Sequence, residues 1–526
     1  MKNPRFVFIV DALTTIAFWG IPMAISQRQS FLAGLAAVLI TVLASAPVTA
    51  TAEEEAANPL ASLPLRNIGP AITSGRVADF AFYPGGDHKF LAGVASGNLW
   101  RTENGGITWT PLFDNEGSYS VGVVEIDPND TNTLWVGTGE NKAQRSVAYG
   151  DGVYKSTDGG KSWVNVGLKD SGHIGKIWIN PADSDEVLVS AHGPLWSDGG
   201  DRGLYRTTDG GASWVRILDI DAYTGINEFV VDPNNADIIL ATSYQRRRHV
   251  WTLINGGPGS GIHKSTDRGK TWTKITSGLP SDHMGKIGIA MAPSEPNRIY
   301  AIIEANDDQK GVYHSADFGS TWSKQSGYMT TSPQYYNELV VDPHNADRVY
   351  ALNTFTMKSE DAGKSFSPLG QQWRHVDDHA LWIDPENTAH LYIGGDGGIY
   401  ETWDLGQTWR HVRNLSITQF YRIQPDYAEP FYNVCGGTQD NNSLCAPSRT
   451  TVVHGITNSD WNIVLGGDGY EPQFDPTNPD ILYAQFQYGG LARYDRRTQE
   501  RKYIAPHPES GENDYKWNWN TPLLVS

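Results

Sequence analysis

Cysteine is nearly absent from this chain, which has two among its 526 residues. Two cysteines are too few for the disulfide frameworks that hold small secreted domains together, and they form no metal-ligand pattern. Leu- and Ala-rich helical periodicity is missing outside the first 50 positions, which argues against a helical bundle. Positive charge is also scarce, since the formal net charge is −18. So acidic a surface excludes nucleic acid or anionic lipid as a general partner.

Glycine, proline and tryptophan are abundant, with 55, 29 and 18 copies respectively. Glycine and proline divide the chain into many short apolar segments, which is the pattern of an all-β sandwich, barrel or propeller. The aromatic residues suit sheets whose flat faces must pack against one another.

One phrase recurs seven times between residues 102 and 409, at intervals of 43 to 58 residues. Its form is Ser/Thr-x-Asp-x-Gly-x-Thr/Ser-Trp, and a fixed phrase at such a period indicates a repeat architecture. The copies are TENGGITW (102–109), STDGGKSW (156–163), TTDGGASW (207–214), STDRGKTW (265–272), SADFGSTW (315–322), SEDAGKSF (359–366) and TWDLGQTW (402–409).

Each copy is predicted to be a turn. Its Asp or Asn side chain accepts hydrogen bonds from the backbone just ahead, and its Gly supplies the positive φ at which the chain reverses. The aromatic residue then begins the next strand and buries its ring. We therefore assign structural rather than catalytic roles to Asn104, Asp158, Asp209, Asp267, Asp317, Asp361 and Asp404.

A second periodic signal, an apolar strand ending in Asp-Pro or a relative of it, fixes the strands of one unit. In the third unit the strands a to d are predicted over 174–181, 186–193, 203–207 and 214–218. Four short antiparallel strands per unit make a propeller blade. The a–b turns and the repeated turns then share one face, and the longer b–c and d–a loops form the other. Variable loops on a rigid frame favour the second face for function.

We expect the propeller to occupy residues 66–526, with seven boxed blades over 66–418 and further blades over 419–526. Two units without a box follow the seventh, and a tenth first strand is predicted over 519–526, where the chain stops within a blade. This pattern predicts a C-terminally incomplete propeller. Two arrangements stay open: a closed ring of seven blades with two extras, and one ten-bladed ring that lacks its last unit.

The N-terminus is predicted to be an export segment over residues 1–52, followed by a linker over 53–65. An apolar run over 31–48 follows Arg28 and leads into small residues that suit a signal peptidase. An uncleaved membrane anchor is the alternative, because 18 apolar residues are just long enough to span. The mature chain is therefore expected outside the cytoplasm, periplasmic or secreted.

The repeated phrase resembles the Asp-box, or BNR repeat, of sialidases, sortilin-type receptors and xyloglucan endoglucanases. Longer stretches, including RNIGPAITSGRV (66–77), GENKAQRSVAYGDGVYKSTDGG (139–160) and HVDDHALWIDP (375–385), resemble bacterial sortilin-type, Vps10-like propeller proteins that are often labelled glycosyl-hydrolase-like. The resemblance covers essentially residues 64–526. It implies an exported propeller and fixes no reaction, because fold and function separate readily.

Two enzyme families that carry this box have further motifs that the chain lacks. The Phe/Tyr-Arg-Ile-Pro lead-in of sialidases has no counterpart. Xyloglucan endoglucanases carry a catalytic Asp in the first blade, where this chain reads GVASGNLW (93–100), with Ser96 near that position. The missing carboxylate argues against a glycosidase of that kind.

The favoured function is binding of a peptide or carbohydrate ligand by the loop face. The longest b–c loop, over 245–260, carries three arginines whose guanidinium groups could clamp a carboxylate or sulfate; their pairing with acids such as Asp282 or Asp221 is the structural alternative. The residues proposed to contact ligand are Glu140, Arg145, Arg246, Arg247, Arg248, His379, Gln439 and Asn441.

The alternative function is a glycoside hydrolase-like enzyme that uses a pair of acids on the same face. The candidate catalytic acids are Asp377, Asp378, Asp396, Asp440 and Asp468. No cofactor or metal is predicted, because the His and Asp of HVDDHA equally suit a satisfied polar network. Cys435 and Cys445 flank an expected hairpin, where a cross-strand disulfide and two buried thiols are both compatible with the sequence.

Overall fold

The computed structural model describes residues 66–144 and 147–526. The export segment and linker predicted over 1–65 therefore lie outside the described residues, as does Arg145. The chain divides into two compact units, Met1–Arg66 and Asn67–Ser526, and every strand belongs to the second. In the described part no helix is both long and apolar enough to cross a membrane.

The second unit is an all-β propeller assembly, with nine antiparallel sheets among the described residues. The first sheet contains β1 (Val77–Phe82), β2 (Phe90–Val94), β3 (Asn98–Thr102) and β4 (Thr110–Pro111). The second contains β5 (Val121–Ile126), β6 (Leu134–Thr138), β7 (Val153–Ser156) and β8 (Val164–Gly167). The third contains β9 (Ile174–Asn180), β10 (Asp183–Ala191), β11 (Gly203–Thr207) and β12 (Val215–Leu218). The fourth contains β13 (Thr224–Asp232), β14 (Asn235–His249), β15 (Thr252–Asn255), β16 (Gly261–Ser265) and β17 (Thr273–Ile275).

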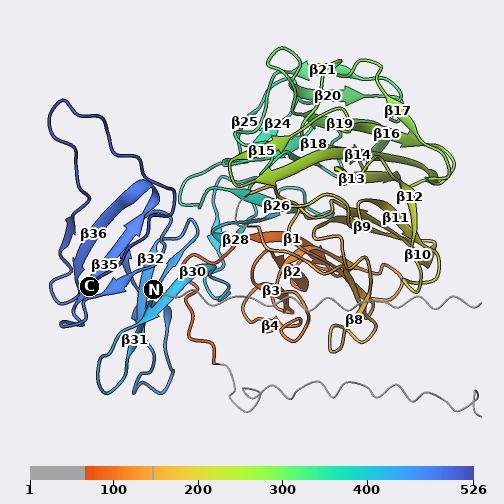
Figure 1. The fold of residues 1–526 in the computed structure, drawn as a ribbon. Helices are drawn as coiled ribbons and strands as arrows, with labels where there is room; N and C mark the ends of the chain where they lie inside the picture. The colour runs from red at the N-terminus through yellow and green to blue at the C-terminus, as the bar shows by residue number, and fades with distance from the viewer. Residues whose placement is uncertain (1–65, 145–146) are drawn as a thin grey trace, which may run out of the picture. The chain divides into compact units, whose positions relative to one another are not determined.

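The next three sheets have the same four-stranded order, and the fifth lies near the top of the ring in Figure 1. The fifth contains β18 (Ile287–Ala292), β19 (Glu295–Ile303), β20 (Gly311–Ser315) and β21 (Ser323–Ser326). The sixth contains β22 (Glu338–Val341), β23 (Val349–Leu352), β24 (Met357–Ser359) and β25 (Ser367–Pro368). The seventh contains β26 (Asp378–Ile383), β27 (Leu391–Gly395), β28 (Gly398–Thr402) and β29 (Arg410–His411).

Two further sheets follow, and these lack the repeated turn. The eighth contains β30 (Phe420–Pro425), β31 (Asn433–Thr438), β32 (Ser443–Pro447) and β33 (Asn462–Leu465), with the 3₁₀ turn η1 (Asn458–Asp460) before β33. The ninth contains β34 (Gln473–Phe474), β35 (Ile481–Phe486), β36 (Gly490–Asp495) and β37 (Arg501–Tyr503), with η2 (Gln487–Gly489) before β36.

The first seven sheets close into a ring. The first strands contact one another in sequence, from β1 to β5, β9, β13, β18 and β22, and β23 contacts β26. The ring closes where β26 and β27 contact β1. A buried cluster that includes Val77 and Phe90 of the first sheet and Tyr392 and Ile399 of the seventh fills this last seam. Of the two arrangements left open by the sequence, the structure has the seven-sheet ring.

The eighth sheet is attached to the segment that precedes β1. Ile68 and Ile72 of that segment pack with Leu444, Ala446 and Trp461, and the Trp461 indole donates to the Ile68 carbonyl at 2.8 Å. The ninth sheet packs on the other side of the eighth, through a cluster that includes Val464, Leu482 and Ala492. The eighth and ninth sheets are thus two extra blades, and the eighth packs against the segment that leads into β1.

The repeated turns have a common hydrogen-bond pattern, illustrated by the second sheet. Asp158 Oδ1 accepts from the backbone N–H of Ser162 at 3.0 Å, and its Oδ2 accepts from the Ser162 hydroxyl at 2.6 Å. Gly160, with φ of 83°, donates its N–H to the Ser156 hydroxyl at 2.9 Å. The indole of Trp163 then donates to the carbonyl of Leu112 in the preceding sheet at 2.7 Å. This turn therefore both reverses the chain and bonds the neighbouring blade, whereas the indoles of Trp272 and Trp322 donate to carbonyls of their own turns.

Two local expectations differ from the structure. The predicted loop over 245–260 is largely a β-hairpin, because β14 continues to His249 and pairs with β15. The predicted strand over 519–526 does not form, and this segment instead receives a backbone hydrogen bond, from Tyr488 N–H to the Trp519 carbonyl at 3.3 Å. Cys435 and Cys445 face each other on β31 and β32 and form a disulfide.

Candidate functional site

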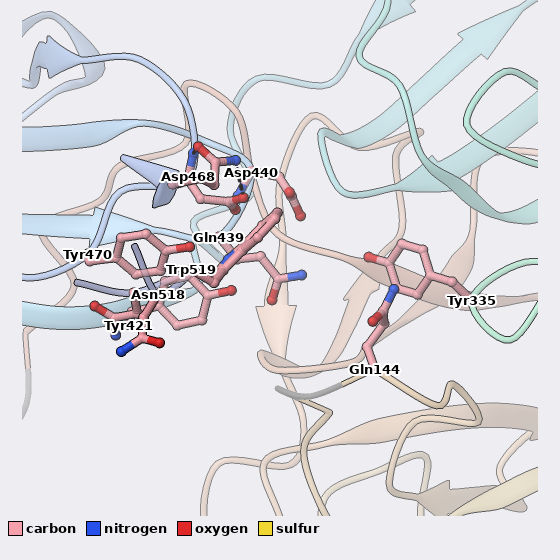
Figure 2. A pocket seen from close by; sticks show the side chains of 11 residues that line it. Gln144, Tyr335, Tyr421, Gln439, Asp440, Asp468, Tyr470, Asn518 and Trp519 are labelled. Atoms are coloured by element: carbon pink, nitrogen blue, oxygen red, sulfur yellow. Dashed lines mark hydrogen bonds between the residues drawn. The ribbon is translucent and has the colours of Figure 1, made fainter. Parts of the chain in front are cut away.

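A cavity of about 590 Å³ lies where loops of the ring meet the two extra sheets. Figure 2 shows Tyr421, Tyr470 and Trp519 grouped on one side, with Tyr335 and Gln144 of the ring on the other. The remaining lining side chains are carboxyls and amides. They are Gln439, Asp440, Asp468, Gln487, Asn518 and Asn520. Aromatic faces combined with several amides suit a ligand that is apolar on its ring faces and polar at its edges.

Two of the predicted acids, Asp440 and Asp468, line this cavity. Asp440 lies in the β31–β32 turn, and Asp468 lies in the connection from β33 to β34. Asp468 Oδ1 accepts from the Asp440 backbone N–H at 2.7 Å, and its Oδ2 accepts from the Gln487 amide. The fold thus places two carboxyl groups from separate loops side by side.

The environment of Asp440 favours its protonated form. Burial, together with the negative charges of Asp396 and Asp468, raises the pKa of Asp440 to about 10. Arg76 opposes this rise only from a distance, since its Nη2 lies 4.0 Å from the Asp440 carboxyl. A carboxylic acid that keeps its proton at neutral pH can act as a hydrogen-bond donor or general acid.

Arg76 is the centre of a buried network behind the cavity. Its guanidinium bonds Glu140 at 3.0 Å and Asp396 at 2.7 Å, and it also contacts the Tyr335 hydroxyl. Burial alone would raise the pKa of Asp396, but Arg76 and His379 hold it well below its ordinary value. Asp396 therefore keeps a negative charge that acts on Asp440.

The other two predicted acids are engaged elsewhere. Asp378 is buried in an ion pair with Arg374, and its second oxygen accepts from the Thr356 hydroxyl at 2.6 Å. Asp377 accepts a hydrogen bond from Tyr336, and burial with the charge of Asp396 raises its pKa. Neither residue lines the cavity. Asp377, Asp396 and Asp440 offer carboxylate oxygens within 4.8 Å of one another, but the guanidinium of Arg76 already neutralises part of this group.

The prediction that the three arginines over 246–248 clamp a ligand is wrong, because their side chains bond other parts of the protein. Arg246 and Arg248 are buried and donate to the backbone carbonyls of Lys142 and Ala143, at 2.8 and 2.6 Å. Arg247 pairs with Asp198, and not with Asp282 or Asp221. Arg246 and Arg248 hold the β14–β15 hairpin on the loop of the second sheet, and Arg247 ties it to the β10–β11 loop of the third, so the three do not offer a fork to a ligand in the cavity.

The remaining residues predicted to contact a ligand fall into two groups, one lining the cavity and one buried behind it. Gln439 lines the cavity. Glu140, His379 and Asn441 are buried behind it: Glu140 on Arg76, His379 with its Nε2 3.2 Å from Asp396, and Asn441 donating to the Asp396 carbonyl at 2.8 Å. These three side chains can shape the site, but they do not reach a ligand in it.

Sequence reasoning missed the aromatic side chains that line the cavity and Arg76, the cation of the network behind it. Tyr335, Tyr421, Tyr470 and Trp519 come from four distant segments, and Arg76 lies in a segment that carries no repeat. A partial signal exists for Tyr470, which follows Asp468 in GGDGY. The other contacts depend on ring closure, which local pattern does not encode.

No family model matches the chain. Among proteins of known function, a xyloglucanase of Paenibacillus sp. is 26% identical over 217 residues, which is 36% of this chain and 20% of that protein. The vacuolar protein sorting/targeting protein 10 of Colletotrichum graminicola is 32% identical over 106 residues, covering 20% of this chain and 6% of its own length. The chain therefore matches only a small part of these relatives.

Among solved structures, the GH74 enzyme of Niastella koreensis superposes with a TM-score of 0.58. The two are 17% identical, and the match covers 85% of this chain and 68% of the other. The resemblance to Vps10-like proteins is supported in part, and the likeness to xyloglucanases, which the Ser96 argument disfavoured, is the stronger one. The chain is a β-propeller with partial similarity to both groups.

Proposed function

We propose that this protein is a glycoside hydrolase-like enzyme whose active site is the cavity lined by Asp440 and Asp468. In this mechanism protonated Asp440 donates its proton to the glycosidic oxygen as the bond to the anomeric carbon breaks. In the same step the Asp468 carboxylate takes a proton from a water molecule whose oxygen bonds the anomeric carbon, or attacks that carbon itself to form a glycosyl ester that water then hydrolyses. The sequence favoured ligand binding over hydrolysis, whereas the similarity to xyloglucanases supports hydrolysis.

The observation that carries the proposal is the unequal pair of carboxyls. Asp440 is held protonated, whereas Asp468 accepts hydrogen bonds at both oxygens, from Asp440 N–H and from Gln487. A carboxyl group held protonated beside a second carboxyl group that accepts hydrogen bonds at both oxygens supplies the proton donor that general acid catalysis requires. The site needs no carboxylate at Ser96, because both acids come from the extra sheets.

The lining supports a carbohydrate substrate. Tyr421 and Tyr470 stack with ring centroids 5.4 Å apart, and Trp519 lies beside them in Figure 2. Aromatic faces pack on the C–H faces of sugar rings, and the surrounding amides can bond hydroxyl groups. Because the related proteins are named xyloglucanases, we propose a β-glucan of the xyloglucan class as substrate.

The test is release of reducing ends from xyloglucan and a panel of other β-glucans by the full chain. Wild type should hydrolyse at least one polymer, and Asp440→Asn should lose activity about 10²–10⁴-fold, the usual contribution of a general acid. Asp307→Asn is the control because this exposed acid pairs only with Lys310 and lies outside the cavity, and it should retain most activity. A folded wild type that turns over none of the panel would remove the hydrolase proposal.

The second candidate is a glycan- or peptide-binding module that uses the same cavity. This candidate is favoured by Asp396, because its carboxylate, whose pKa lies well below the ordinary value, pairs with Arg76 and is not free to act on a ligand in the cavity. Saturable binding of a panel glycan without turnover would support this candidate. Export to the periplasm or beyond stays a prediction from residues 1–52, which lie outside the described residues.

A further inference from the structure

The ring closes between the first and seventh sheets, and the turns on either side of this seam carry side chains that can bind a metal ion. Asp384 follows β26, His390 precedes β27, and Asp87 lies between β1 and β2. The Nδ1 atom of His390 lies 3.1 Å from Asp384 Oδ2 and 3.5 Å from Asp87 Oδ2. The three donor atoms all lie within 4.8 Å of one another. One nitrogen and two carboxylate oxygens thus meet at one point of the seam.

These separations match those between the ligands of a tetrahedral metal ion. Zinc bonds of about 2.0–2.2 Å to nitrogen and oxygen place neighbouring ligands of a tetrahedron about 3.3–3.5 Å apart. The two distances from His390 Nδ1 are close to that separation. Imidazole and carboxylate are both ligands of zinc, whereas calcium and magnesium take oxygen ligands. The donor set therefore fits a divalent ion of the zinc class.

The other nitrogen of His390 is held by a buried carboxylate. Glu401 Oε1 lies 3.0 Å from His390 Nε2, and both side chains are only 2% exposed. Glu401 in turn pairs with Arg410. A proton on Nε2 that is donated to Glu401 leaves the lone pair of Nδ1 directed at Asp87 and Asp384. A carboxylate behind the imidazole is the usual support of a metal-binding histidine.

The carboxylates of this group outnumber its fixed positive charges. Glu401 has the guanidinium of Arg410, but no Lys or Arg of the described chain lies within 4.0 Å of the Asp87 or Asp384 carboxylate. The other basic group beside Asp87 is the exposed ring of His88, at 3.8 Å. Two carboxylates therefore face the His390 ring without a fixed counter-charge, and one divalent cation would supply it.

The sixth sheet has a permanent charge at the corresponding place. Arg348 stands six residues after Asp342 and lies 3.0 Å from its carboxylate and 2.9 Å from that of Glu360. The guanidinium there joins two carboxylates without any ion. His390 stands six residues after Asp384. The seventh sheet thus has an imidazole in place of the guanidinium, together with an additional carboxylate from the first sheet.

We infer that His390, Asp384 and Asp87 bind a divalent cation of the zinc class, which joins the first and seventh sheets across the seam of the ring. Three protein ligands leave the fourth position of the tetrahedron to water. That position has room, because Asp87 and Asp384 line a cavity of about 390 Å³.

The bound ion would stabilise the closed ring. Its ligands come from both sheets of the seam, so opening the ring would require at least one metal–ligand bond to break. None of the three ligands lines the cavity of the proposed active site. The inference therefore does not depend on the reaction proposed above.

The first test is zinc binding by the full chain, stripped of metal with a chelator and titrated with zinc chloride in a calorimeter. About one zinc ion per chain should bind, and saturating zinc should raise Tm by about 2 °C or more. His390→Arg should remove both effects and keep the fold, because arginine carries its own charge at the matching position of the sixth sheet. His454→Ala removes an exposed histidine and should bind zinc as wild type does. Zinc bound equally by wild type and His390→Arg would place the ion elsewhere and count against the site.

Crystals of wild type soaked in zinc provide the deciding measurement, also where His390→Arg does not fold. An anomalous peak at the zinc absorption edge, within bonding distance of His390 Nδ1 and of both carboxylates, is the expected result. A direct hydrogen bond from His390 to Asp384 with no anomalous peak would show an imidazolium that needs no metal, and it would overturn the inference.

Discussion

At the scale of single residues, burial and the negative charge of the neighbouring Asp396 together favour the protonated form of Asp440. Asp396 is held ionised by Arg76 and His379, and its negative charge together with burial raises the pKa of Asp440. Arg76 is therefore a positioning residue, because it fixes Asp396 while standing 4.0 Å from Asp440. The protonation state of Asp440 therefore depends on a hydrogen-bond network that extends from the first sheet to the seventh.

Asp396→Asn should shift the pH dependence of the proposed enzyme. Loss of the negative charge lowers the pKa of Asp440, so the alkaline limb of kcat/KM should move to lower pH, by roughly one unit or more. Asp378→Asn is a suitable control, since this acid pairs with Arg374 and does not raise the pKa of Asp440. An alkaline limb that stays in place in Asp396→Asn would contradict the assignment of Asp440 as the acid.

Single residues are where sequence analysis was least complete. Asp440, Asp468 and Gln439 could be selected because Gly-rich loops carry them, and they do line the cavity. The three arginines over 246–248 could not be interpreted, because two of them bond backbone carbonyls of another sheet. Carbonyl acceptors exist at every position, so no residue type in the sequence identifies them.

At the scale of elements, the repeated turn combines local hydrogen bonds with an aromatic residue that packs beyond the turn. The Asp side chain and the Ser or Thr hydroxyls organise the turn locally, and in the second, third and seventh sheets the Trp that follows donates to a carbonyl of the preceding blade. In the third sheet this bond runs from Trp214 Nε1 to the Val166 carbonyl at 2.8 Å. The local part explains why the sequence predicted the strands so well there, with β9 to β12 lying close to their expected ranges.

The Trp214→Phe variant tests the hydrogen bond from the indole to the neighbouring blade. Phenylalanine keeps an aromatic ring against Trp135 and Val166 but cannot donate to the Val166 carbonyl. We expect a loss of about 1 kcal/mol in the free energy of unfolding, the usual net value of one hydrogen bond with some added packing loss. Chemical denaturation monitored by circular dichroism measures it, with Trp403→Phe, an exposed tryptophan within a repeated turn, as the comparison. Equal stability of Trp214→Phe and wild type would show that the indole bond contributes nothing.

The elements that were mispredicted share one cause. The hairpin of β14 and β15 and the non-strand segment over 519–526 both depend on what lies beside them in space. A strand needs a partner for its backbone groups, and for 519–526 the sequence offered an apolar pattern but no adjacent strand. The sequence could not predict that the ring closes between β1 and β26, because a ring of seven sheets and a ring of ten contain identical blades.

At the scale of the whole molecule, two sets of carboxyls give the stability opposite pH dependence. The turn aspartates Asp209, Asp267, Asp317 and Asp361 have pKa values lowered to about 2, chiefly by hydrogen bonds within their turns. Burial raises the pKa of Asp79 and Glu228 to about 7 and that of Glu125 to about 8. These last three line a cavity of about 190 Å³ between the first strands of the ring.

Stability should therefore pass through a maximum near pH 4–5. Below about pH 4 the unfolded chain binds more protons than the folded turns, so stability is lost as pH falls toward 2. Above about pH 4 the folded protein keeps protons on Asp79, Glu125 and Glu228 that the unfolded chain has released. Stability is then lost as pH rises toward 8.

Glu125→Gln tests the alkaline half of this curve. The amide removes a group that is costly to ionise beside Asp79, so Tm should rise by roughly 1–3 °C at pH 8 and change little at pH 5. Glu386→Gln, on an exposed turn, should change Tm at neither pH. Scanning calorimetry at the two pH values gives the answer, and an equal effect of Glu125→Gln at both would refute the assignment.

The most direct test of the account is a crystal structure of the Asp440→Asn protein with a xyloglucan oligosaccharide. The account predicts sugar rings against Tyr421 and Trp519 and a glycosidic oxygen within hydrogen-bond distance of the side chain at position 440. It also predicts that the Asp468 carboxylate faces the anomeric carbon on the other side of that bond. An oligosaccharide bound elsewhere on the ring, with the cavity holding only solvent, would contradict it.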